Sequence, residues 1–293
     1  MTDQAAALRA LMSAAVASEP KNARVYAVAS GKGGVGKSTV VANLGVAFAS
    51  RGLRTVILDG DLGLANIDVL LDLYTPYTVS HVVKGQKSLE EIMVEGPFGL
   101  KVIPGGSGLT SLVNMDREAR LRLLGQLARV GAKSDMILID TPAGIGQDVI
   151  GLAIAAESVL VVATPEPTSI TDAYALIKVI WQESSNANFQ VLVNQASSEV
   201  TARAASEQLT TVARRFLKID VPTLGYLPVD PNVPKSIRRQ ETVITAFPNS
   251  LASKGFMAIA DRLMEDGVAA ERHSRVFGFV RRLARRGERA AAF

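Results

Sequence analysis

Ten residues near the start of the chain combine glycines, lysines and hydroxyl side chains at a spacing that can hold a phosphate group. The segment SGKGGVGKST, residues 30–39, contains the pattern G-x-x-x-x-G-K-[ST], which is typical of loops that follow a strand and open a helix. Glycine N–H groups can curl around phosphate oxygens, and the helix directs its positive N-terminal end at the same anion. The sequence therefore predicts a nucleoside-triphosphate site. The residues expected to line it are Gly31, Gly33, Gly34, Val35, Gly36, Lys37, Ser38 and Thr39.

The loop contains two lysines, although the pattern requires only one. Lys37 occupies the required position and is expected to reach the β- and γ-phosphates, while Ser38 is expected to place its hydroxyl on Mg²⁺. Lys32 follows the first glycine, where ordinary phosphate loops have no fixed requirement. Its side chain is therefore either a solvated loop lysine or an additional cation for catalysis.

Three carboxylates follow apolar runs that are typical of strands. Asp140 ends the run 135–140 and fits a carboxylate that holds magnesium or its water, and Asp59 and Asp61 end the run 55–61. Parallel strands bind ligands at their carboxyl edge, so we expect these acids beside the phosphate loop. A single acid at a strand end is more often a turn or helix cap. Two acidic strand ends next to a phosphate loop favour a Mg·ATP site.

Alternating strands and helices must position these residues. Apolar runs predict strands at 24–30, 55–61, 100–106, 135–141, 158–165, 189–195 and 223–229, and helical patterns predict helices at 38–50, 117–130, 147–156, 169–182, 200–217 and 250–265. Several strands are continuously apolar, which is typical of parallel strands covered by helices on both faces. We therefore predict an α/β fold with a doubly wound, mostly parallel sheet.

Composition limits the function classes that remain. The chain has no cysteine, which excludes disulfides, Cys-zinc sites and Cys-ligated iron–sulfur clusters. No apolar run reaches the roughly 18 residues that a membrane span requires. The alanine-rich start contains Asp3 and Arg9 where a secretory signal would be basic or apolar, so we expect a mature cytoplasmic protein.

The predicted domain, residues 24–266, has a segment on each side. Residues 1–18 form an amphipathic helix in this interpretation, 19–23 a polar linker and 267–293 a tail. From Glu271 to Phe293 seven arginines and two glutamates give a net charge of +5, so the rest of the chain carries −1. The nearly neutral body argues against a broad nucleic-acid face.

The tail has the pattern of a basic amphipathic helix over residues 273–286. Apolar and basic side chains occupy separate arcs, which suits an anionic membrane interface. The alternative is a tail that docks on its own body or on a protein partner. The residues expected at the membrane are Val276, Phe277, Phe279, Val280, Leu283, Arg281 and Arg282.

The loop GKGGVGKS, residues 31–38, resembles the deviant Walker A loop of the MinD/ParA ATPases, and residues 59–73 and 139–146 resemble their switch regions. The resemblance covers most of residues 24–265. It implies ATP and Mg²⁺ as cofactors and an ATP-dependent homodimer that encloses two ATP molecules. In that dimer Lys32 would cross the interface to the partner's phosphates and act like an arginine finger.

The same resemblance assigns roles to residues on other strands. Asp61 would orient the attacking water, and Asp59 and Asp140 would support magnesium. Asn194 would read the adenine edge, although loop capping explains it nearly as well. Capping is also the alternative for the last residue of a second adenine-contacting segment, which consists of Pro228, Val229 and Asp230.

The N-terminal segment DQAAALR, residues 3–9, resembles a motif of the flagellar-number regulators FlhG (also called FleN or YlxH). This resemblance implies that the segment binds the signal-recognition-type GTPase FlhF and stimulates its GTP hydrolysis. A frayed helix that packs on the body is the alternative. The residues expected to contact the partner are Asp3, Gln4, Leu8 and Arg9.

Together these observations predict an ATPase that dimerises on ATP and regulates flagellar number and placement. It would cycle between the cytoplasm and the inner face of the cell membrane, with a flagellar transcription activator or a C-ring protein as a further partner. The alternatives are a ParA-type DNA-partitioning ATPase, a division-site MinD, and a regulator in which ATP sets only the shape.

Overall fold

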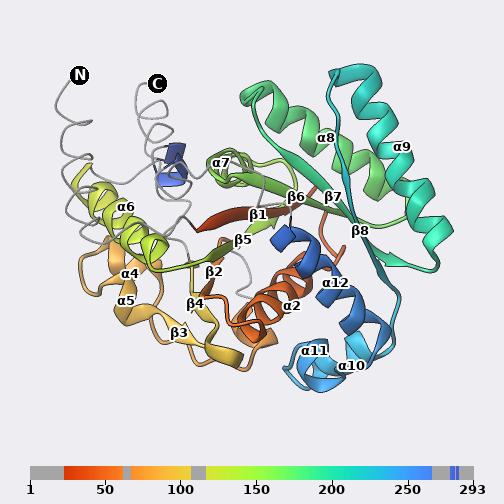
Figure 1. Cartoon of the computed structure of the whole chain (residues 1–293). Helices are drawn as coiled ribbons and strands as arrows, with labels where there is room; N and C mark the ends of the chain where they lie inside the picture. The colour runs from red at the N-terminus through yellow and green to blue at the C-terminus, as the bar shows by residue number, and fades with distance from the viewer. Residues whose placement is uncertain (1–22, 62–66, 107–116, 266–277, 281, 284–293) are drawn as a thin grey trace.

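The computed structural model describes residues 23–61, 67–106, 117–265, 278–280 and 282–283. Within these ranges eight strands form one sheet in the order β3-β4-β2-β5-β1-β6-β7-β8 (Figure 1), and every pair is parallel except β3 with β4. The predicted doubly wound α/β fold is thus confirmed. The strands are β1 (Arg24–Ser30), β2 (Thr55–Asp59), β3 (Val94–Glu95), β4 (Lys101–Ile103), β5 (Met136–Ala143), β6 (Ser158–Ala163), β7 (Phe189–Ala196) and β8 (Thr223–Pro228).

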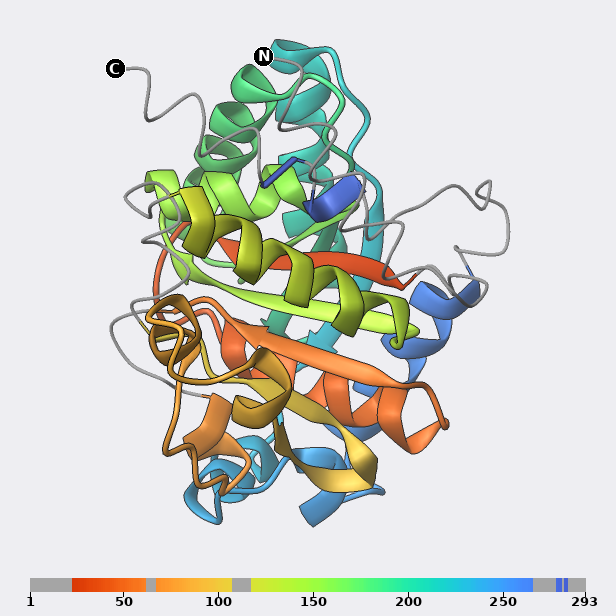
Figure 2. The same ribbon diagram turned by 90° about the vertical axis from the view of Figure 1, so that its left-hand side faces the viewer.

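Helices cover both faces of this sheet, because successive strand residues point to opposite sides. On β1, Val25 and Ala27 belong to the core beneath α6, α7, α8 and α9, whereas Tyr26 and Val28 belong to the core beneath α2 and α12. Figure 2 shows α6 on one side of the strands and the light-blue α10 and α11 on the other. The helices are α2 (Lys37–Ser50), α3 (Ile67–Leu70), α4 (Val79–Val83), α5 (Leu89–Ile92), the 3₁₀ turn η1 (Pro97–Gly99), α6 (Arg117–Ala132), α7 (Gln147–Ala155), α8 (Pro167–Glu183), α9 (Glu199–Leu217), α10 (Asn232–Arg238), α11 (Val243–Ala246) and α12 (Leu251–Glu265).

All seven predicted strands and the six predicted helices of the domain are present, with shifted ends. The edge strand β3 and the short helices α3, α4, α5, α10 and α11 were not predicted, because segments of two to seven residues are too short to show a period. The prediction that a strand ends at Asp140 is wrong: β5 continues to Ala143. The predicted helix at the N-terminus lies outside the described residues.

The described part of the C-terminal tail packs against the body. Phe279, Val280 and Leu283 are buried in the core on the α6–α9 side of the sheet. The guanidinium of Arg282 donates hydrogen bonds of 3.0 Å to the carbonyl oxygens of Ala155 and Ala156 at the end of α7. For these residues the structure shows the alternative, a tail docked on its own body, and membrane contact stays a prediction. Val276, Phe277 and Arg281 lie outside the described residues.

None of the described helices is both long enough and apolar enough to cross a bilayer.

Candidate nucleotide-binding site

The phosphate loop connects β1 to α2, as its pattern predicted. Gly36 precedes α2 with a φ of 83°, in the left-handed region that favours glycine. A Cβ atom at Gly36 would lie 2.5 Å from Nδ2 of Asn194. Glycine is therefore required at this position both by the turn and by the close approach of β7.

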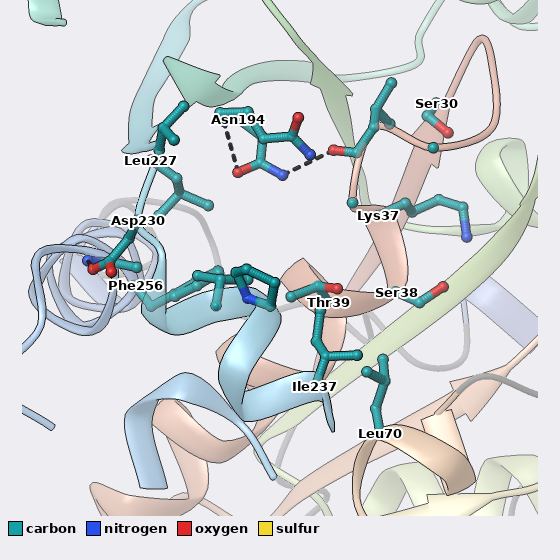
Figure 3. Close-up of a pocket in the computed structure, with 18 of the residues that line it drawn as sticks. Ser30, Lys37, Ser38, Thr39, Leu70, Asn194, Leu227, Asp230, Ile237 and Phe256 are labelled. Atoms are coloured by element: carbon teal, nitrogen blue, oxygen red, sulfur yellow. Dashed lines mark hydrogen bonds between the residues drawn. The ribbon is translucent and has the colours of Figure 1, made fainter. Parts of the chain in front are cut away.

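One cavity of about 910 Å³ gathers residues from the phosphate loop, from Asp61 and α3, from the ends of β5 and β7, and from 227–256. Figure 3 shows Lys37 and Ser38 at one end, Asp230 and Phe256 at the opposite end, and Asn194 along one side. Most of the predicted nucleotide residues line this cavity: Gly33, Gly34, Val35, Gly36, Lys37, Ser38, Thr39, Asp61, Asn194, Pro228, Val229 and Asp230. Gly31, Lys32, Asp59 and Asp140 do not contribute to its lining.

A buried ion pair lies behind the phosphate loop. Nζ of Lys37 is 2.5 Å from Oδ1 of Asp140, and both side chains are almost fully buried. Burial raises the pKa of Asp140, and the neighbouring Lys37 opposes that rise. The Lys37 ammonium, which is expected to contact the phosphates, is therefore fixed near the loop by the carboxylate of Asp140 on β5.

Asp59 lies next to this pair, opposite Asp140 in the register of β2 and β5. Burial and the charge of Asp140 raise the pKa of Asp59 to about 7. Oδ2 of Asp140 is buried and accepts no hydrogen bond from the described residues. Ionisation of Asp59 would leave two buried carboxylates with one lysine, so the predicted residues fit a divalent cation that balances this charge.

Magnesium would need further ligands at this place. Among the residues that the structure describes, no group of three or more acidic or histidine side chains is clustered to hold a metal ion by itself. Mg²⁺ usually takes one or two carboxylates and completes its octahedron with water and substrate phosphates. The hydroxyl of Ser38, which lowers the pKa of Asp140, and the carboxylates of Asp59 and Asp140 are the side chains available for that role.

Asp61 follows β2 and lines the cavity. Its N–H donates to Oδ1 of Asp59 at 3.1 Å, which fixes the backbone between the two acids. This position leaves Asp61 within the nucleotide cavity but outside the buried carboxylate pair. The predicted role in orienting water is compatible with this position and stays a prediction.

Asn194 and Asp230 are both occupied by local hydrogen bonds. Nδ2 of Asn194 donates to the carbonyl of Val35 at 2.8 Å, which ties β7 to the phosphate loop. Oδ1 and Oδ2 of Asp230 accept the N–H groups of Asn232 at 2.8 Å and Ala252 at 2.9 Å. The capping explanation thus accounts for the carboxylate of Asp230, which shapes the wall between α10 and α12. Adenine contact by either residue stays a prediction.

Sequence reasoning missed the apolar wall of the cavity. This wall comes from α3, the end of β8, α10 and α12, and comprises Val69, Leu70, Leu227, Pro231, Val233, Pro234, Ile237, Ala252 and Phe256. The spacing of Val233 and Ile237, one helical turn apart, is the one local signal that could have indicated a shared face. Gln195, with a φ of 55°, also lines the cavity and was not predicted.

Lys32 does not line the cavity and instead contacts the start of α8. Its Nζ donates to Oε2 of Glu166 at 2.6 Å and to Oγ1 of Thr168 at 3.1 Å, at the start of α8. The structure therefore separates the two lysines of the loop: Lys37 lies behind the phosphate site, and Lys32 lies beside it. The expected partner contacts Asp3, Gln4, Leu8 and Arg9 lie outside the described residues.

The arrangement fits a nucleotide, with a polar phosphate end and an apolar base end. A family profile described as "ParA: NUBPL iron-transfer P-loop NTPase" matches residues 21–264. The chain is 40% identical to the antiactivator FleN of Pseudomonas aeruginosa over 260 residues, which is 89% of this chain and 93% of that protein. It is 33% identical to the flagellum site-determining protein YlxH of Helicobacter pylori, covering 83% of this chain and 82% of that protein.

A solved structure gives the same result for the fold. The septum site-determining protein MinD from Pyrococcus horikoshii, complexed with Mg-ADP, superposes with a TM-score of 0.68 at 25% identity and covers 85% of this chain and 100% of its own.

Proposed function

The chain belongs to the ParA/MinD family of P-loop ATPases, and from that premise we propose that it regulates flagellar number and placement as an ATP-dependent dimer of the FlhG type. The observation that carries this proposal is the combined cavity and ion-pair geometry, in a chain 40% identical to an antiactivator, FleN, over 89% of its length. The iron transfer in the family description has no support here, because the chain has no cysteine to bind iron.

ATP binding in this proposal begins with an exchange of partners at Lys37. Its Nζ, now 2.5 Å from Oδ1 of Asp140, turns to the β- and γ-phosphates, while the backbone N–H groups of the loop surround them. Magnesium, when bound, neutralises phosphate charge. Ser38, Asp59 and Asp140 would hold it or its waters, and Asp61 would orient the attacking water. The apolar wall around Ile237 and Phe256 encloses the base.

Lys32 is the cation that a second copy supplies. Because its side chain lies outside its own cavity, it can act on a nucleotide held by a facing subunit. A cation at the γ-phosphate stabilises charge that develops in the transition state. Hydrolysis then depends on dimerisation, and the rate of hydrolysis sets the lifetime of the dimer.

The tail would convert dimerisation into membrane residence. Phe279, Val280 and Leu283 are buried on the body and must undock before they can enter an anionic lipid interface. Two tails in one dimer bind more tightly than one through effective concentration. The protein would thus move between cytoplasm and membrane, while residues 1–18 contact an FlhF-like GTPase and the dimer contacts a transcription activator or a C-ring protein.

A cell-based experiment tests this function. In a flagellated host whose own copy is replaced by the Lys37→Ala variant, flagella per cell counted by electron microscopy should rise or lose their normal placement. The matched control is Lys178→Ala, which removes an exposed lysine on α8. Unchanged flagellar number and placement with Lys37→Ala would contradict the proposed function.

A further inference from the structure

The contact between Lys32 and the start of α8 has no role in binding the subunit's own nucleotide. Nζ of Lys32 lies 2.6 Å from Oε2 of Glu166 and 3.1 Å from Oγ1 of Thr168, and neither of these residues lines the cavity. We infer that Glu166, assisted by Thr168, is a positioning residue that holds Lys32 within its own subunit until a facing subunit's nucleotide competes for it. This inference rests on the proposed dimer.

The backbone at Lys32 is held by close packing and by a hydrogen bond, whereas its side chain is long and flexible. A Cβ atom at Gly31 would lie 2.1 Å from the carbonyl oxygen of Asp172, which means that the loop is pressed directly against α8. The hydroxyl of Ser30 donates to the carbonyl of Lys32 at 2.9 Å. A lysine has a flexible four-carbon stem. The competition is therefore between two positions of one ammonium group.

Glu166 has no competing structural task among the described residues. It occupies the N-cap position of α8, yet its side chain caps no backbone N–H of that helix. Glutamate is not among the residues preferred for capping. The side chain is 67% exposed, and among the described residues its partner is Lys32. Holding this lysine is thus what the Glu166 side chain does in the structure.

The hold on Lys32 is weak enough to be reversible. The ammonium lies at the positive N-terminal end of α8, where the helix dipole disfavours a cation, so the charge of Glu166 must offset that repulsion. The lysine side chain is 29% exposed, and exposed ion pairs contribute little to stability. A phosphate group on a facing subunit can therefore win the competition.

Each dimer must break two of these contacts. A substitution that removes the contact in both subunits should therefore tighten the dimer. For two exposed ion pairs of typical strength, the dissociation constant of the dimer should fall by about 2- to 30-fold. Because salt screens exposed charges, the gain should shrink as ionic strength rises from about 0.05 M to about 0.5 M.

The experiment compares full-length Glu166→Gln with the parent protein by sedimentation equilibrium, in Mg²⁺ and a non-hydrolysable ATP analogue. We expect the Glu166→Gln dimer to be about 2- to 30-fold tighter at low salt, with unchanged affinity of the monomer for nucleotide. Glu183→Gln, at the other end of α8, makes the same charge change without touching Lys32 and should leave the dimer constant unchanged. Thr168→Val should act in the same direction as Glu166→Gln, but more weakly.

The double variant Lys32→Ala/Glu166→Gln distinguishes the positioning role of Glu166 from the proposed dimer itself. Alone, Lys32→Ala should weaken the dimer, and adding Glu166→Gln should then change nothing. If Lys32→Ala weakens the dimer but neither Glu166→Gln nor Thr168→Val strengthens it, the positioning role is wrong and the dimer proposal stands. If Lys32→Ala has no effect on the dimer, the proposed function itself fails.

Discussion

The two ends of the nucleotide cavity are built in different ways. The phosphate end consists of one contiguous loop and two neighbouring strands, and it works through backbone N–H groups and buried charges. The base end is apolar and combines α3 with β8, α10 and α12, three elements that lie close together in the sequence but far from the phosphate loop. The difference implies that the phosphate end provides most of the free energy of nucleotide binding, while the base end mainly provides a surface that fits the shape of the base.

The strongest test of this contrast is Lys37→Ala. Removing the main counter-ion of the phosphates, which also leaves Asp140 buried without its cation, should reduce ATP affinity by roughly 100-fold or more. Isothermal titration calorimetry measures the change, and a melting curve checks that the variant is folded. An ATP affinity within a few-fold of the parent's would show that the phosphate end does not dominate.

The buried carboxylates of the phosphate end should also affect the stability of the ligand-free protein. Folded Asp59 keeps its proton up to a pKa of about 7, whereas an unfolded aspartate ionises near 4. The ligand-free protein therefore loses stability from this group as pH rises between those values, because the folded state binds the additional proton. Asp59→Asn cannot ionise and retains an oxygen for the N–H of Asp61.

The free energy of unfolding of Asp59→Asn, relative to the parent, should therefore increase by about 1–3 kcal/mol between about pH 4 and pH 7 and then level off. Urea unfolding in the presence of a chelator, at a series of pH values, measures this difference. A difference that stays constant or decreases with pH would contradict the assignment of a protonated Asp59.

The smallest expected effect belongs to the base end. Ile237→Ala removes part of the apolar wall at a residue that is 39% exposed, so ATP affinity should fall by only about 3- to 10-fold. Binding of tripolyphosphate, which has no base, should not change. Phe216→Ala, an exposed apolar residue of α9, serves as the control. Equal losses for ATP and tripolyphosphate would remove the distinction between the two ends.

The same contrast explains what the sequence could predict. The phosphate loop, Asp59, Asp61 and Asp140 were predictable because the spacing of a loop and the ends of apolar strands are local properties. Val233, Ile237 and Phe256 have the composition of ordinary core residues, and only the folded sheet brings α10 and α12 to the phosphate loop, which lies far from them in the sequence. Glu166 was missed for the same reason: 134 residues separate it from Lys32.

The tail shows a second limit of sequence reasoning. Periodicity correctly predicted that Phe279, Val280 and Leu283 share an apolar face, and these side chains are buried. An amphipathic pattern predicts which side chains share an apolar face but not what covers that face. The same apolar residues are suited to a protein core and to a lipid interface. The structure identifies the body of the protein as the surface that covers them.

The central claim is that two copies enclose two nucleotides and that each lends Lys32 to the other. Sedimentation velocity of Asp61→Ala in saturating Mg·ATP measures it most directly, because the variant should bind ATP without consuming it. We predict a dimer with ATP, a monomer with ADP, and a monomer with ATP once Lys32→Ala is added. A protein that remains monomeric with Mg·ATP in the Asp61→Ala background would contradict the account.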